Sequence, residues 1–498
     1  MPELDAAFAA LPYRRLAEAA LTRAGELGAT HADFRLERRR SQFVKARDHG
    51  LERLLDSETV GLSVRVVHGG AWGFASDIDL TPDGAARTAE AAVAVATTLA
   101  PLNSEPVELA PEAPQQGTWV SAYDVDPFAV PDADKIAYLL AVNERVLASG
   151  RVSHVDFVVR LVKEGKYLAS LDGADLTQER LRVEGDFTAV RTDPSTGDLD
   201  TMRSCSLPAE RGWEHFTDGH DYLAEAAEVP DLLVEKMASP SVEPGRYDLV
   251  IHPTNLWLTI HESIGHATEL DRVLGYEANY AGTSFATLDK LGTLQYGSPA
   301  MHVTGDRLVA HGLATSGWDD EGVPAQQWDL IRDGVLVGYQ LNRQMAQRQG
   351  FGRSNGCAYA DGPSAVPLQR MPNVSLQPAA AEVTLDDLIG GVEDGIYVVG
   401  DRSWSIDMQR YNFQFTAQRF YRIRAGKLAG QLKDVAYQGT TTRFWNAMDA
   451  VGGPSTWVLG GSFNCGKGQP GQSAPVSHGA PAALFRQVKV LNTTREAR

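Results

Sequence analysis

The residues best suited to chemistry lie together in the run His261-Glu262-Ser263-Ile264-Gly265-His266. Neutral imidazoles are ligands that zinc prefers, and a carboxylate beside the first of them can act as base for a zinc-bound water. The histidines are one position further apart than in the common zinc-protease signature. In a regular α-helix this spacing turns the second ring about 140° away from the first, so both rings cannot face one ion. The run is therefore either a coincidence or part of a distorted helix.

Gly265 favours the distorted helix. A glycine is costly inside a helix unless the backbone must deviate there. A π-helical turn, in which a hydrogen bond spans five residues, would bring His261 and His266 to the same side. A helix that ended at Gly265 would have the same effect by another route. We therefore expect a metal-binding helix whose regular geometry breaks near Gly265.

Two histidines leave a zinc site one ligand short, because a catalytic zinc usually has three protein ligands and a water. Glu269 lies one helical turn after His266 and is one candidate for the third ligand. Cys465 is the other, since it lies in a glycine-rich segment, residues 460–468, whose backbone suits a close approach. The alternative for Cys465 is a buried, inert thiol. A match to the dinucleotide-binding fingerprint at residues 466–471 is rejected, because the turn residues after it leave no helix for the pyrophosphate.

The elements that must hold these residues indicate an α+β fold with two domains. Apolar periodicity predicts helices at residues 13–27, 81–99, 132–147 and 220–237, and strands at residues 62–66, 155–162 and 181–190. They form an N-terminal mixed α/β domain with a largely antiparallel sheet, residues 1–238. Prolines and small polar residues at 239–245 indicate a linker. Residues 239–498 are then a C-terminal β-rich domain that contains the metal-binding helix.

Composition argues against several classes of partner. The chain of 498 residues carries a formal charge of −18, which disfavours nucleic acid and anionic membrane surfaces. No apolar run approaches the roughly 20 residues of a membrane span, and the acidic start, with Glu3 and Asp5, is unlike a secretion signal. Three widely spaced cysteines, Cys205, Cys357 and Cys465, form no disulfide framework. They favour a reducing compartment, so we expect a cytoplasmic protein.

Four short motifs together resemble the TldD/PmbA family of metalloproteases, and they occur in the family's order over nearly the whole chain. They are the run His261 to His266, Asp319-Asp320-Glu321-Gly322, Arg410-Tyr411-Asn412-Phe413 and Cys465-Gly466-Lys467. The resemblance implies that His261, His266 and Cys465 are ligands of a Zn²⁺ ion and that Glu262 is the catalytic carboxylate. Because the metal motif is present, the chain resembles the catalytic TldD-type subunit and not its PmbA-type partner.

The resemblance also implies a peptidase that acts on peptides or unfolded polypeptide segments. The enzyme would work as a homodimer or as a heterodimer with a motif-lacking paralogue. Two departures from the family concern substrate preference more than metal binding: the segment 465–472 is long, and His478 stands where a less polar residue is expected. The strand at residues 412–416 is a candidate edge for pairing with an extended substrate.

Two other functions remain open. A cysteine hydrolase would use Cys465 as nucleophile and His266 as base. A metal-stabilised binding subunit would hold peptides without cleaving them, although such a role has no need of Glu262. The acidic run 319–321 would hold a second cation or shape the cleft, but a solvated turn is favoured over both.

Overall fold

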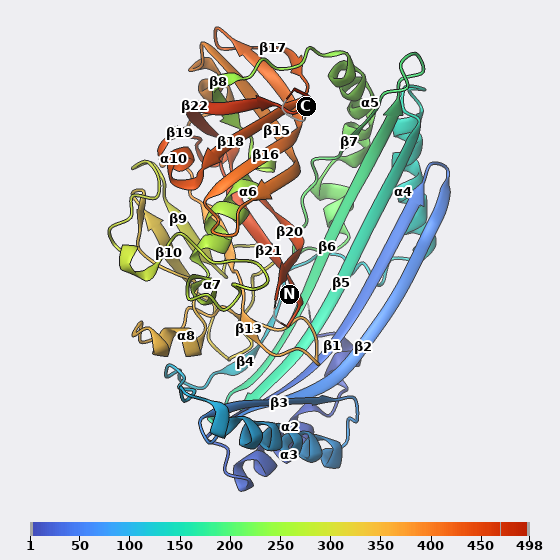
Figure 1. The fold of residues 1–498 in the computed structure, drawn as a ribbon. Coiled ribbons are helices and arrows are strands. Elements are labelled where there is room, and N and C mark those ends of the chain that lie inside the picture. Colours follow the sequence, from blue (N-terminus) through green and yellow to red (C-terminus); the bar gives the residue numbers. More distant parts are fainter. Residues whose placement is uncertain (1–2, 469, 496–498) are drawn as a thin grey trace.

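A long, mainly antiparallel sheet is built by the first half of the chain, with strand order β3-β2-β1-β5-β6-β4 and with β7 paired to β6 (Figure 1). The computed structural model describes residues 3–468 and 470–495. Strand β4 runs parallel to β6, whereas the other neighbours in this sheet run antiparallel. The strands are β1 (His31–Arg47), β2 (Gly50–His68), β3 (Ala71–Asp77), β4 (Gln116–Val120), β5 (His154–Ser170), β6 (Asp175–Thr192) and β7 (Leu199–Arg203).

The helices predicted for the first half of the chain are confirmed. Figure 1 shows α2 and α3 at one end of the long sheet and α4 and α5 near the other end. Helix α3 lies close to the sheet because Gly73 of β3 has no side chain. A Cβ atom added at Gly73 would lie 1.9 Å from the carbonyl oxygen of Ala92 on α3. The bounds are α1 (Ala6–Ala9), α2 (Tyr13–Glu26), α3 (Pro82–Leu99), α4 (Asp132–Leu147) and α5 (Tyr222–Ala238).

The second half of the chain is rich in strands, as predicted, and its main sheet closes on itself. Strands β15, β8, β22, β18 and β16 form a closed ring, because β15 pairs with both β8 and β16. The fold is therefore of the α+β class. The strands of this sheet are β8 (Gly245–Ile251), β15 (Asp394–Ile406), β16 (Asn412–Arg424), β17 (Lys427–Leu432), β18 (Val435–Thr440), β19 (Met448–Val451) and β22 (Ala483–Asn492).

Smaller sheets and short helices complete the second half. One sheet has the order β11-β10-β9-β14, and β12-β13 and β20-β21 form two hairpins. The bounds are β9 (Val303–Asp306), β10 (Gln327–Arg332), β11 (Val335–Leu336), β12 (Ala358–Tyr359), β13 (Leu368–Gln369), β14 (Asn373–Leu376), β20 (Val458–Lys467), β21 (Gln472–Ala480), α6 (Pro253–Ile260), α7 (Leu270–Val273), α8 (Arg343–Arg348), α9 (Leu385–Gly390) and α10 (Thr441–Asn446).

The prediction of a free strand edge at residues 412–416 is wrong. Asn412 to Phe415 on β16 pair with Thr440 to Tyr437 on β18, and the opposite side of the same segment pairs with β15. Both rows of backbone hydrogen bonds are already used within the ring. An extended substrate therefore cannot pair with this segment unless the sheet opens.

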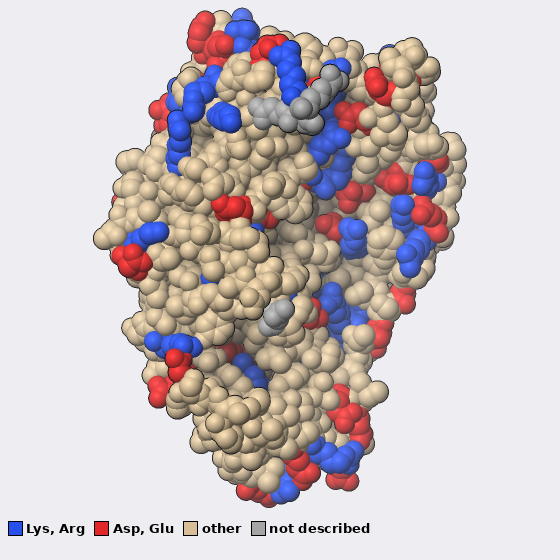
Figure 2. Space-filling model, viewed as in Figure 1, with Lys and Arg blue, Asp and Glu red and all other residues tan. Residues whose placement is uncertain are grey.

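Buried ion pairs join the long sheet to the second half of the chain. Figure 2 shows a furrow on the surface between these two parts of the molecule. Asp320 lies 2.9 Å from Lys166 on β5, and Glu321 lies 3.2 Å from Arg65 on β2. Asp319, Asp320 and Glu321 are only 2%, 4% and 8% exposed. The favoured prediction of a solvated turn is therefore wrong. Cations on the long sheet balance Asp320 and Glu321, whereas Asp319 accepts hydrogen bonds from the backbone N–H groups of Val323 and Ala358.

The predicted linker is packed against the second half of the chain. The backbone N–H of Val242 donates to the carbonyl oxygen of Lys433 at 3.0 Å, and the Ser241 hydroxyl donates to Asp434 at 2.6 Å. The division into domains at residue 239 stays a prediction. Within the described residues, no helix has the length and apolar character that a bilayer span requires.

Candidate metal centre

The helix that carries the histidines changes geometry where the sequence predicts it. Helix α6 continues into a π-helical turn, His261–Gly265, and then into a 3-10 turn, His266–Thr268. The backbone N–H of His266 donates to the carbonyl oxygen of His261, which is the five-residue closure of a π turn. The distorted-helix prediction is confirmed, and the π turn brings the two imidazole centroids to 4.6 Å.

Gly265 is required by a close approach from another part of the chain. A Cβ atom at this position would lie 2.5 Å from the sulfur of Met371 and 3.6 Å from a ring carbon of His478. The π turn is therefore pressed against side chains that lie more than a hundred residues later in the sequence. Absence of a side chain at Gly265 permits this packing.

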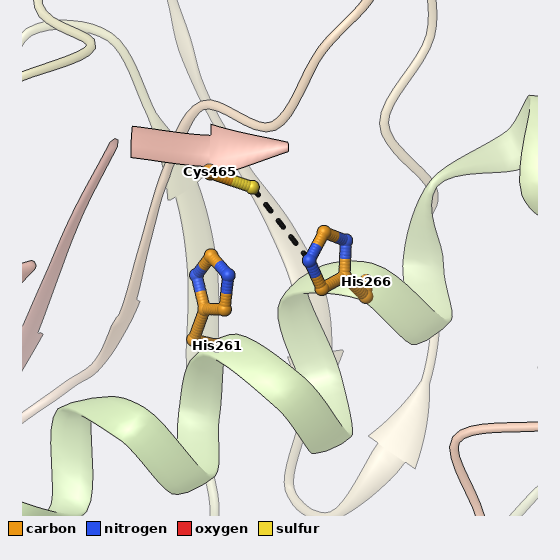
Figure 3. A group of neighbouring side chains, drawn as sticks. All are labelled: His261, His266 and Cys465. Atoms are coloured by element: carbon orange, nitrogen blue, oxygen red, sulfur yellow. Dashed lines mark hydrogen bonds between the residues drawn. The ribbon is translucent and has the colours of Figure 1, made fainter. Parts of the chain in front are cut away.

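Three side chains that can bind a metal meet at this turn. One ligand atom from each of His261, His266 and Cys465 lies within 4.8 Å of the others, and the Cys465 Sγ atom lies 3.6 Å from Nε2 of His266 (Figure 3). All three residues are buried, with 6%, 6% and 4% exposure. Within the described part of the chain, these three residues form the group of histidine, cysteine or carboxylate side chains that lie close enough together to bind one metal ion. Two nitrogens and one sulfur are a donor set that suits zinc.

The glycine-rich segment that contains Cys465 forms most of a strand, β20. Strand β20 passes over α6, where a Cβ atom at Gly460 would lie 2.7 Å from the Trp257 ring. The glycines therefore allow the strand and the helix to touch, and Cys465 follows on the same strand. Gln469, within the long segment 465–472 noted in the sequence, lies outside the described residues. Strand β21 begins at Gln472, so no helix follows the rejected dinucleotide pattern.

The Nδ1 atom of each histidine contacts a second side chain. His261 Nδ1 lies 2.7 Å from Nε2 of His478, and His266 Nδ1 lies 2.7 Å from a carboxylate oxygen of Glu269. Glu269 thus contacts the ring nitrogen of His266 that is not beside Cys465. This position makes Glu269 a support for the imidazole instead of the third ligand considered above. Such partners orient histidines in metal sites.

The charges around the trio favour the protonation states that bind a metal. Burial lowers the pKa of the His261 and His266 imidazoles, so both rings are neutral at pH 7. Burial opposes ionisation of the Cys465 thiol, but His266 and Arg370 outweigh it and lower the thiol pKa below its usual range. The site therefore offers two neutral nitrogens and a readily formed thiolate.

Glu262 faces a guanidinium group. Its Oε2 atom accepts a hydrogen bond of 2.7 Å from Arg410, and the Glu262 residue is 6% exposed. Arg410 adopts a left-handed backbone conformation with φ of 62°, and its carbonyl oxygen accepts a hydrogen bond from the Thr441 hydroxyl. Arg410 thus reaches Glu262 from a backbone position in the left-handed region that the Thr441 hydroxyl helps to hold.

Sequence reasoning named the trio and Glu262 but missed the residues that support them. The sequence patterns assign no role to His478, and they do not place Arg370 or Lys467 at the site. One signal was available for Lys467, because residues two apart on a strand point to the same side and Lys467 follows Cys465 by two. Lys467 lies 3.1 Å from Glu269, the same carboxylate that contacts Nδ1 of His266.

Comparison with protein families gives two matches. Residues 244–492 match the PmbA/TldA metallopeptidase C-terminal domain, and residues 32–96 match the PmbA/TldA metallopeptidase domain 1. The first match covers the helix with both histidines as well as Cys465. It also covers Arg410.

Individual relatives agree with these matches. A metalloprotease of Methanothermobacter thermautotrophicus is 28% identical over 463 residues, which cover 93% of this chain and 96% of that protein. A zinc metalloprotease TldD homolog of Saccharolobus solfataricus is 23% identical and covers 94% of this chain and 98% of its own length. The solved structure of TldE from Thermococcus kodakarensis has the same fold, with a TM-score of 0.70 at 16% identity over 95% of this chain and 99% of its own.

Proposed function

The chain belongs to the PmbA/TldD metallopeptidase family, and from this premise we propose that it is a zinc-dependent peptidase of the TldD type. Its substrates would be peptides or unfolded polypeptide segments. The observation that carries the proposal is the meeting of His261, His266 and Cys465 within 4.8 Å, directly beside Glu262. The name of the Saccharolobus solfataricus relative supports zinc as the metal.

The three side chains fit a zinc ion because they are buried, uncharged or singly negative, and of the nitrogen and sulfur types that zinc prefers. A zinc ion held by His261, His266 and Cys465 would polarise the peptide carbonyl and acidify a water molecule. Glu269 and His478 would keep the two imidazoles oriented toward it.

Glu262 is the general base in this proposal. Arg410 engages the Oε2 atom of its carboxylate, which leaves Oε1 to take the proton of the attacking water. The same carboxyl group then gives that proton to the nitrogen of the departing amine. Arg410 holds the carboxylate in place during both transfers and keeps its negative charge balanced.

Two substitutions test the assignment of roles. Cys465→Ser should lose most of the bound zinc, whereas Cys205→Ser, which changes a thiol distant from the trio, should keep one zinc per chain. Glu262→Gln should keep the zinc and lose peptide cleavage by a factor of about 100 or more. Metal analysis and a peptide-digestion assay on the same preparations separate the two effects. Full zinc occupancy in Cys465→Ser would remove this residue from the ligand set.

One contact favours a second candidate function, a cysteine hydrolase. The Cys465 sulfur lies 3.6 Å from His266 Nε2, a distance that also suits a nucleophile and its base. Removal of metal with a chelator distinguishes the two functions, because a cysteine hydrolase keeps its activity and a metallopeptidase loses it. A third possibility, a metal-stabilised subunit that binds peptide without cleavage, would release no product with any metal.

We also propose that the chain acts as a dimer. The likeness in fold to TldE of Thermococcus kodakarensis supports a partner of the same fold. The family resemblance implies that such a partner lacks the histidine motif. A homodimer is the alternative. Mass measurement of the native complex, purified from cells that contain both proteins, distinguishes the two assemblies.

A further inference from the structure

Arg370 places a positive charge inside the protein without a carboxylate to balance it. The residue is 1% exposed, and no carboxylate oxygen of the described residues forms an ion pair with it. Arg272 and Arg182 differ, because Arg272 pairs with Glu269 and Glu277 and Arg182 pairs with Glu164. Arg307 shares the lack of an ion pair, but it lies against the Ser316 hydroxyl and not beside the trio. A buried, unbalanced guanidinium is costly, so its retention calls for a compensating group.

Arg370 lies directly beside the candidate metal centre. Its Nη2 atom donates to the carbonyl oxygen of Cys465, and the next residue, Met371, packs against Gly265 of the π turn. The positive charge of Arg370 also contributes to lowering the pKa of Cys465 and of His261. The guanidinium thus occupies the Cys465 side of the centre, whereas Arg410 occupies the Glu262 side.

Arg370 and Arg410 differ in whether a carboxylate of the protein balances their charge. Glu262 balances the charge of Arg410 through a hydrogen bond of 2.7 Å. Arg370 has two nitrogens, Nε and Nη1, that lack any hydrogen-bond partner within the described part of the chain. A Cys465 thiolate would balance the charge of Arg370, but the guanidinium contacts the carbonyl of that residue and not its sulfur. Both N–H groups are thus buried with unused hydrogen-bonding capacity, which an oxygen ligand that reached the centre would satisfy.

We propose that Arg370 binds an anionic oxygen of the substrate through Nε and Nη1. The inference rests on the proposed peptidase function and extends it to a substrate-contacting residue. A guanidinium presents its N–H groups in a fork that matches such an oxygen. The oxygen has two possible sources: the free carboxylate of a peptide C-terminus, or the oxyanion that develops on the attacked carbonyl.

The first arm of the test measures binding without cleavage. Zinc-loaded Glu262→Gln protein is titrated calorimetrically with tetra-alanine that ends in a free carboxylate and with tetra-alanine that ends in an amide. If Arg370 holds a terminal carboxylate, the acid binds at least about 10-fold more tightly, and adding Arg370→Gln abolishes the difference. Because this arm requires no turnover, it can fail while the proposed peptidase function stands.

The second arm measures turnover in protein with Glu262 intact. If Arg370 stabilises the oxyanion, acid and amide bind equally in the first arm. Arg370→Gln then lowers kcat by about 100-fold or more and changes KM by less than about 3-fold. Arg370→Lys keeps the positive charge but loses the paired N–H groups of the guanidinium. The kcat of this variant should therefore lie between that of the parent and that of Arg370→Gln.

A matched control separates substrate binding from folding. Arg307 is also buried, at 3% exposure, and it contacts the Ser316 hydroxyl instead of the metal centre. Arg307→Gln removes a buried charge of the same kind and should leave the acid–amide preference, kcat and KM unchanged. If Arg370→Gln does not fold, the comparison is made with Arg370→Lys and Arg307→Lys.

Two results would overturn the inference. In one, Arg370 variants with full zinc occupancy keep both the acid–amide preference and kcat of the parent. In the other, the Arg370 variants lose zinc affinity, and both binding and turnover recover completely when zinc is supplied in excess. Arg370 would then act only by balancing the Cys465 thiolate.

Discussion

Nε2 of His478 lies 2.7 Å from Nδ1 of His261, and this contact determines the proton positions on both rings. His478 Nδ1 lies 2.9 Å from the carbonyl oxygen of Val374, which can only accept a hydrogen bond. His478 therefore carries its proton on Nδ1, and its Nε2 accepts the proton on His261 Nδ1. The Nε2 atom of His261 keeps its lone pair, which is the form that binds a metal.

We expect His478→Ala to weaken zinc binding by about 10–100-fold, because His261 loses the partner that sets its tautomer and ring orientation. Competition with a chelator of known zinc affinity measures the change. His302→Ala, which alters a histidine paired with Asp329 away from the trio, is the control and should bind zinc like the parent. Equal zinc affinity in the His478 and His302 variants would contradict the proposed support.

Gly265→Ala should destabilise the protein by about 1–3 kcal/mol, because the added methyl group would lie 2.5 Å from the Met371 sulfur. The obstacle is the end of a flexible side chain, so the fold should survive. Urea unfolding of the parent, Gly265→Ala, Met371→Ala and the double variant gives the coupling between the two positions. The alanine at 265 should cost less in the Met371→Ala background, and an equal cost in both backgrounds would show that this contact is not the constraint.

Lys467→Met should destabilise the protein by about 3–5 kcal/mol, because it removes the cation that faces three buried carboxylates. Lys467 Nζ lies 3.1 Å from Glu269, 2.8 Å from Asp271 and 3.3 Å from Glu277. Lys489→Met, at an exposed lysine, should change stability by less than about 0.5 kcal/mol. Chemical denaturation measures both variants. A loss as small as that of the control would mean that the carboxylates find other partners.

Glu210 makes part of the stability depend on pH. Burial raises the pKa of Glu210 to about 7 although Arg180 lies 3.2 Å away. Since the folded state holds this proton more tightly than the unfolded state, the contribution of Glu210 is complete below about pH 4.5 and disappears as the pH rises through about 7. The total change is on the order of 3 kcal/mol.

Glu210→Gln should remove this pH dependence, because glutamine is neutral throughout. The free energy of unfolding of the parent, relative to Glu210→Gln, should therefore fall between pH 5 and pH 8. Denaturant titrations at several pH values measure this difference. A constant difference over that range would contradict the raised pKa.

The long sheet shows why part of the fold escaped sequence reasoning. Strands β1 and β2 form a hairpin from His31 to His68, and apolar residues alternate at Ala32, Phe34 and Leu36 as well as at residues 62–66. Arg35 and Glu37 on β1 look like solvent-facing residues in the sequence, yet they are 2% and 0% exposed. Charged residues in that position are buried only because the second half of the chain covers them. Local apolar periodicity cannot reveal such a surface.

At the candidate site, sequence reasoning predicts the ligand types, the unusual spacing of His261 and His266 and the deviation at Gly265. These follow from short-range geometry, because a helix whose ligands are five positions apart must deform to bring them together. Long-range packing, in contrast, brings Cys465, 199 residues after His266, to the same point. It also brings His478, Glu269 and Arg370 around the centre. Their positions depend on how strands from distant parts of the chain pack against the π turn, and neighbouring residues in the sequence do not specify that packing.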